Sequence, residues 1–364
     1  MSITFVRKQS HLKNTEKHFL LYKICFLTFF CCISFESKSQ NNNEEICYRL
    51  VFWNVENLFD IWDDSTKNDG DFTPRGENHW TKERYNHKLT NIYKTLAALG
   101  QHKNAHFDMP WIVGLAEVEN DKVLRDLCMG TPLRRHKYCY IHFESPDRRG
   151  IDNALLYRQD KFHPLYAKAI TVSDSTKDFF TRDILLVNGV SSQGDTLIIL
   201  VNHFPSKRGG SAADLQRQEV ASILRHTMDS LQISHPCAGI VVMGDFNASP
   251  DEPEIAKTLM KRDNNDFINL MSTIEPGKGS HKYQGNWSCL DQIIVSSSLC
   301  DSSSCAKMHV IQHSGQIFDA PFLLVDDERY MGKKVFRTYM AMKYQGGYSD
   351  HLPVFIDIKT VNKH

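Results

Sequence analysis

The chain has 364 residues, and its 43 Lys and Arg residues balance 43 Asp and Glu residues, so the formal net charge is zero. Residues 1–39 hold six of the basic and two of the acidic residues, so the remainder carries a net charge of −4. This balance argues against a protein held on nucleic acid by overall positive charge, because such binding depends on neutralising phosphates. It does not exclude an enzyme that contacts phosphate through a bound cation.

The first forty residues have the layout of a secretory signal peptide. Basic residues between Arg7 and Lys17 precede an apolar run, Phe19–Phe35, which only Lys23 interrupts. Small serine residues then stand just before Gln40, where a signal peptidase would cleave. The order of basic, apolar and small residues therefore indicates export.

The apolar core of this segment is short. Its uninterrupted part covers residues 24–35, too few to span a bilayer comfortably. We predict a signal peptide over 1–39, a flexible lead-in over 40–47, and a mature protein in the periplasm or outside the cell. The long basic segment leaves an uncleaved N-terminal membrane anchor as the alternative.

Seven of the ten cysteines follow residue 39, and their spacing contains no CxxC pair of the kind that binds metals. Because seven is an odd number, at least one thiol stays free even if all the others pair. Cys300 could pair with Cys305, and Cys128 with Cys139. Structural thiols without any bridge are the alternative.

Short apolar runs and helical patterns alternate along the rest of the chain. Thr81 precedes a helical pattern that extends to Leu99, and residues 211–232 form a second one. The strands at 153–157 and 184–201 follow one another without such a helix, which predicts hairpins. The predicted strands are RLVFW (49–53), WIVGLA (111–116), NALLY (153–157), ILLVNGV (184–190), TLIILV (196–201), GIVVMG (239–244), QIIV (292–295) and PVFIDI (353–358).

This mixture of hairpins and crossover helices favours an α+β sandwich, with mixed sheets covered by helices, over a doubly wound parallel sheet. The sequence contains no internal repeat, and no Pro- or Ser-rich linker divides it. We therefore predict one large domain over residues 48–359.

Polar residues of a restricted kind stand at the ends of six predicted strands. Each end carries Asn, Asp, Glu or His, and none carries Lys, so carboxylates would gather without a basic partner. Such a group is stable around a hard divalent cation, and oxygen ligands suit Mg²⁺ or Ca²⁺ better than Zn²⁺. Strand periodicity also places Asp245 and Asn247 on the same side. The residues are Asn54, Glu117, Asn202, His203, Asp245, Asn247, Asp291, Asp350 and His351.

Six motifs around these residues, WNVEN, GLAEVEN, NHFPS, GDFN, LDQIIVS and GYSDHLPV, occur in an order that resembles the endonuclease/exonuclease/phosphatase superfamily. That family includes deoxyribonuclease I, apurinic endonucleases, sphingomyelinases and inositol polyphosphate 5-phosphatases. The resemblance covers about residues 48–359. It implies a four-layer α/β/β/α sandwich, with two mixed β-sheets packed face to face and helices outside, and a metal-dependent phosphoester hydrolase.

The resemblance also implies roles for the residues at the strand ends. Glu117 is the expected primary ligand of Mg²⁺, or of Mn²⁺ or Ca²⁺, with Asn54 and Asp350 on the metal side. Asp245 is expected to orient and deprotonate the attacking water. Asn247 would hold a phosphate oxygen beside it. Asp291 and His351 resemble the family's buried carboxylate–histidine pair.

A second histidine resembles that of the deoxyribonuclease I-like members. His203 matches their catalytic histidine, and Asp152 lies at the place of its acidic partner. Arg182 resembles an arginine that contacts phosphate. Arg149 and Arg337 are candidates for phosphate binding from their charge alone.

These expectations describe an exported, metal-dependent phosphodiesterase that acts as an endonuclease on nucleic acid. His203 with Asp152 favours the nuclease, whereas the lack of excess basic charge favours a hydrolase of phospholipids, inositol phosphates or other phosphoesters. A non-catalytic binding module on the same fold is a third alternative, which the intact set of candidate groups disfavours. We predict no stable protein partner.

Overall fold

The computed structural model describes residues 47–360 except 103–107, 175, 177, 262–265 and 302–303. The predicted signal peptide and most of the lead-in lie outside the described residues. Within the described residues, none of the helices has both the length and the apolar character that crossing a membrane requires.

The first of two large sheets has the strand order β13–β19–β1–β2–β4–β3, with β14 pairing with β19. Its central strands β1 and β2 run parallel, and β19 runs antiparallel to β1. The strands are β1 (Cys47–Leu58), β2 (Ile112–Val118), β3 (Tyr138–His142), β4 (Asp152–Arg158), β13 (Met308–Val310), β14 (Gln316–Ile317) and β19 (Val354–Thr360).

The second sheet has the order β5–β6–β7–β8–β12–β9. Its parallel pair is β7 and β8, and β12 runs antiparallel to β8. The strands are β5 (Phe162–Ile170), β6 (Ile184–Ser191), β7 (Thr196–His203), β8 (Gly239–Asp245), β9 (Phe267–Asn269) and β12 (Asp291–Ser296). The predicted hairpin over 184–201 is therefore present as β6–β7, but the strand predicted at 153–157 belongs to the other sheet.

Each parallel pair needs a long crossover, and a helix supplies it. Helix α2 (Lys82–Gln101) connects β1 to β2, and Thr81 caps it by accepting a hydrogen bond from the backbone N–H of Arg84 at 3.4 Å. Helix α4 (Gly210–Ser234) connects β7 to β8. The sequence predicted both helices, whereas α3 (Asp121–Gly130) was missed.

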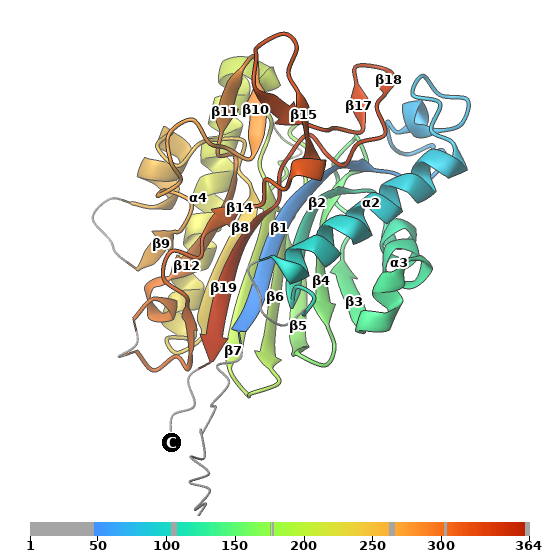
Figure 1. Ribbon diagram of the computed structural model, residues 1–364. Coiled ribbons are helices and arrows are strands. Elements are labelled where there is room, and N and C mark those ends of the chain that lie inside the picture. The colour runs from blue at the N-terminus through green and yellow to red at the C-terminus, as the bar shows by residue number, and fades with distance from the viewer. Residues whose placement is uncertain are drawn as a thin grey trace, which may run out of the picture. The chain divides into compact units, whose positions relative to one another are not determined.

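The helices and the two sheets form four layers (Figure 1), and clusters of buried apolar side chains lie between them. One cluster packs α2 and α3 on the first sheet, and a second lies between the two sheets. A third packs α4 on the second sheet. Because side chains alternate along a strand, each strand of a sheet contributes to both of its faces. The predicted α/β/β/α sandwich is thereby confirmed.

Three small hairpins lie at the end of the sheets where β1 finishes and β19 begins (Figure 1). They are β10 (His281–Tyr283) with β11 (Asn286–Ser288), β15 (Leu324–Asp326) with β16 (Lys333–Val335), and β17 (Tyr339–Met340) with β18 (Lys343–Tyr344). We call them the rim hairpins. The remaining short helices are η1 (Gly70–Phe72), η2 (Pro132–His136), η4 (Lys207–Gly209), η5 (Glu254–Leu259), η6 (Ser297–Leu299) and η7 (Pro321–Leu323).

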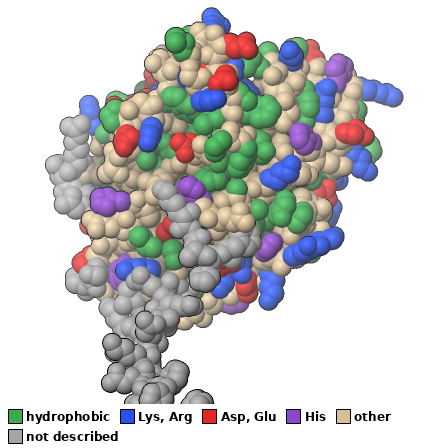
Figure 2. All heavy atoms as spheres, in the orientation of Figure 1, with side chains coloured by type: hydrophobic (Ala, Val, Ile, Leu, Met, Phe, Trp, Pro, Cys, Tyr) green, Lys and Arg blue, Asp and Glu red, His purple; other side chains and the backbone are tan. Residues whose placement is uncertain are grey.

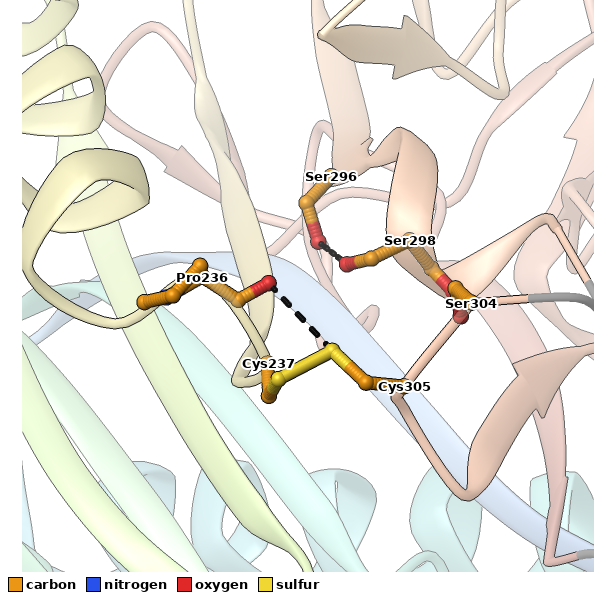
Figure 3. Close-up of a disulfide and its surroundings, with 6 residues drawn as sticks. All are labelled: Pro236, Cys237, Ser296, Ser298, Ser304 and Cys305. Atoms are coloured by element: carbon orange, nitrogen blue, oxygen red, sulfur yellow. Dashed lines mark hydrogen bonds between the residues drawn. A yellow bond between two sulfur atoms is a disulfide. The ribbon is translucent and has the colours of Figure 1, made fainter.

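One disulfide is present among the described residues, and it joins Cys237 to Cys305 (Figure 3). Both predicted pairs are therefore wrong, since Cys128, Cys139 and Cys300 are free thiols. The physical reason is that the bridge depends on spatial approach and not on sequence spacing. Here it links segments 68 residues apart, one leading into β8 and the other toward β13.

Candidate active site

Three predicted site residues form a row across the second sheet. The strand register places His203 of β7 beside Asp245 of β8, and Asp245 beside Asp291 of β12. Along each strand these residues share the alternation of the apolar side chains that pack between the two sheets. All three are nearly inaccessible to solvent. The sequence therefore delivers an imidazole and two carboxylates to one place through register alone.

The first sheet brings its own polar residues against this row. The Asn54 side chain, on β1, donates a hydrogen bond from Nδ2 to Oδ2 of Asp245 at 3.1 Å. Its Oδ1 accepts from the backbone N–H of Glu56 at 3.0 Å, so both ends of the amide are engaged. The resemblance implied that Asn54 lies on the metal side. In this structure its side chain instead holds Asp245.

Glu117 reaches the site because β2 is irregular at this point. Strict alternation would place it with Leu115 on the helix-covered face, but the pairing register shifts between Ala116 and Val118. The backbone of Glu117 adopts a positive φ of 63°, and its Oε1 lies 4.0 Å from Nε2 of His203. Left-handed conformations at a non-glycine residue cost free energy and collect at functional sites.

His351 and Asp291 form a buried pair. Nδ1 of His351 lies 2.7 Å from Oδ2 of Asp291, and its Nε2 lies 3.7 Å from Oδ2 of Asp245. Burial by itself would lower the pKa of His351, but the carboxylates of Asp291 and Asp245 outweigh it and raise this pKa well above the usual value. The imidazole is therefore charged at neutral pH, held between two carboxylates.

Asp245 is the centre of the arrangement. Its Oδ1 accepts from the backbone N–H of Asn247 at 2.9 Å, while Asn54 and His351 face Oδ2. Burial, reinforced by Asp291, raises the pKa of Asp245 to about 7. A carboxylate with this pKa can accept a proton near neutral pH. Asn247 has a φ of 48°, and its Nδ2 donates to the carbonyl of Phe204 at 3.0 Å.

His203 differs from His351 in its charge state. Burial, together with the nearby Arg182 and Arg149, lowers the pKa of His203 well below the usual value. Its Nε2 faces Glu117 and Asp245, so this neutral imidazole carries its proton there. Its Nδ1 is buried and has no hydrogen-bond partner among the described residues.

The predicted pair between His203 and Asp152 is not formed. Asp152 accepts from the backbone N–H of Ser145 at 3.0 Å, and its Oδ2 lies 3.3 Å from Nε2 of His142. Alternation along β4 explains this correction, because Asp152 shares the helix-covered face with Ala154. The side chain one residue further along β4 lies on the opposite face, toward the other sheet. His142, Glu144 and Asp152 instead form a separate group with one ligand atom each within 4.8 Å.

The structure places the two predicted phosphate-binding arginines differently. The Arg182 side chain is only 4% exposed, and it donates to Oδ2 of Asp147 at 3.2 Å and to the carbonyl of Phe204 at 2.6 Å. The same carbonyl accepts from Asn247. Arg182 therefore holds the backbone at Phe204 in place and is not directed at a substrate. Arg149 is 49% exposed, beside Asp147, and stays a predicted phosphate ligand.

Sequence reasoning missed a charged group next to Asp350. The buried Glu56 accepts from the backbone N–H of Thr338 at 2.6 Å and from Arg337 at 3.3 Å. Arg337 also donates to Asp350 at 2.9 Å. Lys88 of α2 is buried next to this group, and burial lowers its pKa to about 8. A signal existed for Glu56, since it lies within WNVEN, and for Lys88, which occupies the apolar face of a helix.

The donor set fits a hard divalent cation. Arg337 donates to Glu56 at 3.3 Å and to Asp350 at 2.9 Å, and the charge of Glu117 also acts on this guanidinium. Burial, followed by the charge of Asp350, raises the pKa of Glu56 to about 7. All the donors are oxygen atoms, as Mg²⁺ prefers. Asn54, Glu117 and Asp350 are the predicted metal-side residues, and Glu56, which shares Arg337 with Asp350, is a further candidate.

A further histidine, His281 of β10, lies against His351. Their ring centroids are 4.8 Å apart, and the two residues form an isolated antiparallel bridge. Burial, followed by the charge of His351, lowers the pKa of His281 to about 4. The neutral His281 ring therefore covers the charged ring of His351. No motif pointed to His281, because HKY lies outside every motif used to predict the site.

A two-sheet sandwich with carboxylates, amides and imidazoles at the joined ends of its sheets defines a class of phosphoester hydrolases. Residues 49–360 match the Endonuclease/Exonuclease/phosphatase family, and the chain belongs to that family. The resemblance drawn from the six motifs is thus confirmed. Members of this family hydrolyse phosphoesters and generally depend on a divalent metal. No curated protein matches the sequence.

Solved structures share the fold at low sequence identity. The human Nocturnin catalytic domain with a bound sulfate is 18% identical, with a TM-score of 0.51 over 87% of this chain and 96% of that chain. TDP2 from D. rerio, in complex with a single-strand DNA product, is 15% identical, with a TM-score of 0.52 over 86% and 99%. A Bacteroides thetaiotaomicron mannosyl-6-phosphatase is 16% identical, with a TM-score of 0.50 over 85% and 99%.

Proposed function

We propose that the protein is an exported, divalent-metal-dependent phosphodiesterase that cleaves nucleic acid as an endonuclease. One observation carries the proposal. Asp245 lies within 4 Å of the imidazoles of His203 and His351 and accepts a hydrogen bond from Asn54, and its pKa is raised to about 7. A general base needs this combination of fixed orientation and tuned pKa.

The chain's own residues divide the work of water attack on a phosphodiester. Asp245, oriented by Asn54 and Asn247, accepts the proton of the attacking water. The charged His351 donates to a phosphoryl oxygen or to the leaving oxygen, and Asp291 keeps it protonated and fixed in orientation. A divalent cation held by Glu117, Asp350 and Glu56 would supply stabilisation of negative charge on the phosphoryl group.

A phosphomonoester or lipid-phosphate hydrolase is the second candidate. Basic and acidic side chains are interspersed on the face seen in Figure 2, without a continuous basic surface for a long duplex. The structural similarity to a mannosyl-6-phosphatase agrees with a small substrate. The similarity to TDP2 solved with single-strand DNA product agrees with a nucleic acid. A single-stranded nucleic acid agrees with the mixed surface charge and with the similarity to TDP2, since few of its phosphates need to contact the protein.

Export is part of the proposal and is supported by the signal-like N-terminal sequence. The disulfide between Cys237 and Cys305 also supports it, because disulfides form and persist in oxidising compartments outside the cytosol. Expression of the full chain followed by fractionation tests this part. The processed protein is expected outside the cytoplasmic fraction, and retention of the unprocessed chain there would contradict export.

Purified residues 40–364 test the activity. They are incubated with plasmid DNA, single-stranded DNA, RNA, sphingomyelin, inositol phosphates and mannose 6-phosphate, each with Mg²⁺ and with EDTA. We expect cleavage of nucleic acid that EDTA abolishes and that Asp245→Asn loses. Turnover of only a lipid or sugar phosphate would replace the nuclease by the second candidate. Titration calorimetry with Mg²⁺, comparing the wild type with Glu117→Gln, reports the metal site independently of turnover.

A further inference from the structure

A cavity of about 230 Å³ opens directly beside the candidate active site. Asp350 and Arg337, joined by a hydrogen bond of 2.9 Å, form one side of it. The other sides come from all three rim hairpins, through the β10–β11 turn at Gly285, the residues between Asp327 and Val335 of the β15–β16 hairpin, and Met340 of β17. Any substrate whose phosphate lies against Asp350 therefore has its neighbouring group at the mouth of this cavity.

Four basic side chains line the cavity, and two of them already have acidic partners. Lys282 donates to Asp327 at 2.9 Å and to two backbone carbonyls, and Arg337 contacts Glu56 and Asp350. The side chains of Arg329 and Lys334 make no ion pair with any described residue. Two positive charges thus remain for an anionic group of the substrate.

The rest of the lining mixes apolar and polar residues. Tyr330 is 40% exposed and Met340 is 44% exposed, Val335 is largely buried, and Gln284 and Asp327 are polar. The side chain of Tyr330 packs on Gly285, where an added Cβ would lie 3.1–3.2 Å from three of its atoms. Gly285 also has a φ of 87°, so the turn needs glycine for its own conformation and for seating this ring.

We propose that this cavity is a nucleotide subsite, in which a base stacks on Tyr330 while Lys334 and Arg329 bind the phosphate that follows it. The proposal rests on the proposed function and narrows it to single-stranded or unpaired nucleic acid, because a base must leave its duplex stack to reach Tyr330. Pockets for drug-sized ligands measure about 300–1,000 Å³, so a cavity of this size suits one base.

An exposed ring gives the cavity a surface that a base can use. Lys282, Gln284 and Asp327 offer hydrogen bonds that a sugar could also accept, but Tyr330 and Met340 add an aromatic and apolar surface that sugar hydroxyl groups do not need. A base has a π face that stacks on tyrosine whatever its sequence. The guanidinium of Arg329 lies over the ring of Tyr330, 5.1 Å from its centroid, in a cation–π contact, so one positive charge lies next to the ring on which a base would stack.

Steady-state kinetics with single-stranded oligonucleotides test the subsite. Tyr330→Ala is expected to raise KM about 5- to 100-fold, the range that loss of one stacked base gives, with a smaller change in kcat. Tyr330→Phe keeps the ring and should restore a near wild-type KM. Lys334→Ala should raise KM and weaken its dependence on salt. Tyr283→Ala and Lys333→Ala, on the same hairpins but outside the cavity, are matched controls and should behave as the wild type.

An abasic substrate identifies the contact itself. When one nucleotide beside the scissile phosphate lacks its base, the wild type should bind the oligonucleotide more weakly than the intact one. Tyr330→Ala should bind the abasic and the intact oligonucleotide equally. If the wild type cleaves single-stranded DNA but Tyr330→Ala and Lys334→Ala keep its KM, the subsite is wrong and the proposed function stands. If the wild type cleaves no nucleic acid, both fail. If Tyr330→Ala and Lys334→Ala raised KM for mannose 6-phosphate but not for the oligonucleotide, the cavity would bind a sugar and the nucleotide subsite would be wrong.

Discussion

Asp245 is the residue on which the hydrogen bonds of the candidate site converge, and its replacement gives the sharpest test at this scale. Asp245→Asn preserves size and can still accept from Asn247, but it cannot accept a proton from water. We expect kcat to fall about 10²- to 10⁴-fold, as loss of a general base does, with thermal unfolding close to that of the wild type. His351→Ala should lose hydrolysis to a similar extent. A purified variant with an unchanged rate would remove the residue from the mechanism.

The pair of Asp291 and His351 makes a prediction about pH. Asp245 works as a carboxylate, so activity should rise as pH increases through about 7. His351 works as a cation, so activity should fall again only as pH rises through its raised pKa. Asp291→Asn removes the carboxylate that raises this pKa most, and burial then lowers it. The alkaline limb of kcat/KM against pH should therefore move to lower pH. An alkaline limb that does not move would exclude His351 as its source.

The same residues show what sequence can predict about a site. That Asn54, Asp245, Asp291 and His351 come together was predictable, because each lies in a motif next to a predicted strand end. The contact of Asn54 with Asp245 was not predicted, because these two residues lie on different sheets. The partner of Asp152 was mispredicted because a resemblance locates the strand in the sequence but does not say which face of the sheet each side chain lies on. A shift of one residue along a strand moves the side chain to the opposite face. The neutral state of His203 follows from burial and two arginines distant in sequence, which only the folded chain reveals.

At the scale of elements, backbone contacts set the path of Gly346 and Gly347, which lead into Asp350 and His351. A Cβ on Gly347 would overlap the carbonyl oxygen of Phe336, so no larger residue can replace this glycine unless that segment moves. Helix α2 also fixes the approach, because Asn91 donates to the carbonyl of Gly347 at 2.9 Å and Lys88 to that of Tyr348 at 2.6 Å. The helix thus carries part of the active-site geometry.

Gly347→Ala should therefore displace the segment that carries Arg337. We expect unfolding to become easier by about 1–3 kcal/mol, as overpacking of a tight contact does, together with a loss of activity from the shifted Asp350. Chemical denaturation and kcat measure the two effects. Gly130→Ala is the control, because nothing lies within 4 Å of its added Cβ and its stability should barely change. Wild-type stability and activity in Gly347→Ala would show that the segment can move freely.

The elements themselves divide by how much their sequence constrains them. All eight predicted strands and both helical patterns are present, because a continuous apolar run or a 3.6-residue period reports burial directly. Strand β5 was missed because its side chains are mostly half-buried or exposed and leave no apolar run. The rim hairpins of two or three residues per strand were missed for the same reason, although they line the cavity beside the site.

At the scale of the whole molecule, the order of strands within each sheet was not predictable from the chain. The pattern of apolar runs shows that strands exist, while their assignment to one sheet or the other depends on contacts between distant segments. Strand β4 illustrates this, since it precedes β5–β7 in sequence but pairs with β2 and β3 in the other sheet. The resemblance to a known family supplied the two-sheet arrangement that periodicity alone left open.

The disulfide gives a prediction at this scale, because Cys237 and Cys305 connect the segments that lead into β8 and toward β13, which belong to different sheets. Closing a loop of this size restricts the unfolded chain and stabilises a protein by about 2–4 kcal/mol. Cys305→Ser should lower the free energy of unfolding by that amount in oxidising buffer. It should leave kcat close to that of the wild type, since Asp245 lies at the opposite end of β8.

Cys300→Ser is the matched control, because Cys300 is a free thiol five residues from Cys305. Urea unfolding of both variants, with and without a reducing agent, separates the two pairings. The reductant should destabilise the wild type and Cys300→Ser equally, and it should have no effect on Cys305→Ser. If Cys300→Ser instead lost the stability and its response to reductant, the bridge would join Cys300 and Cys305. The two sheets would then be held together by packing alone.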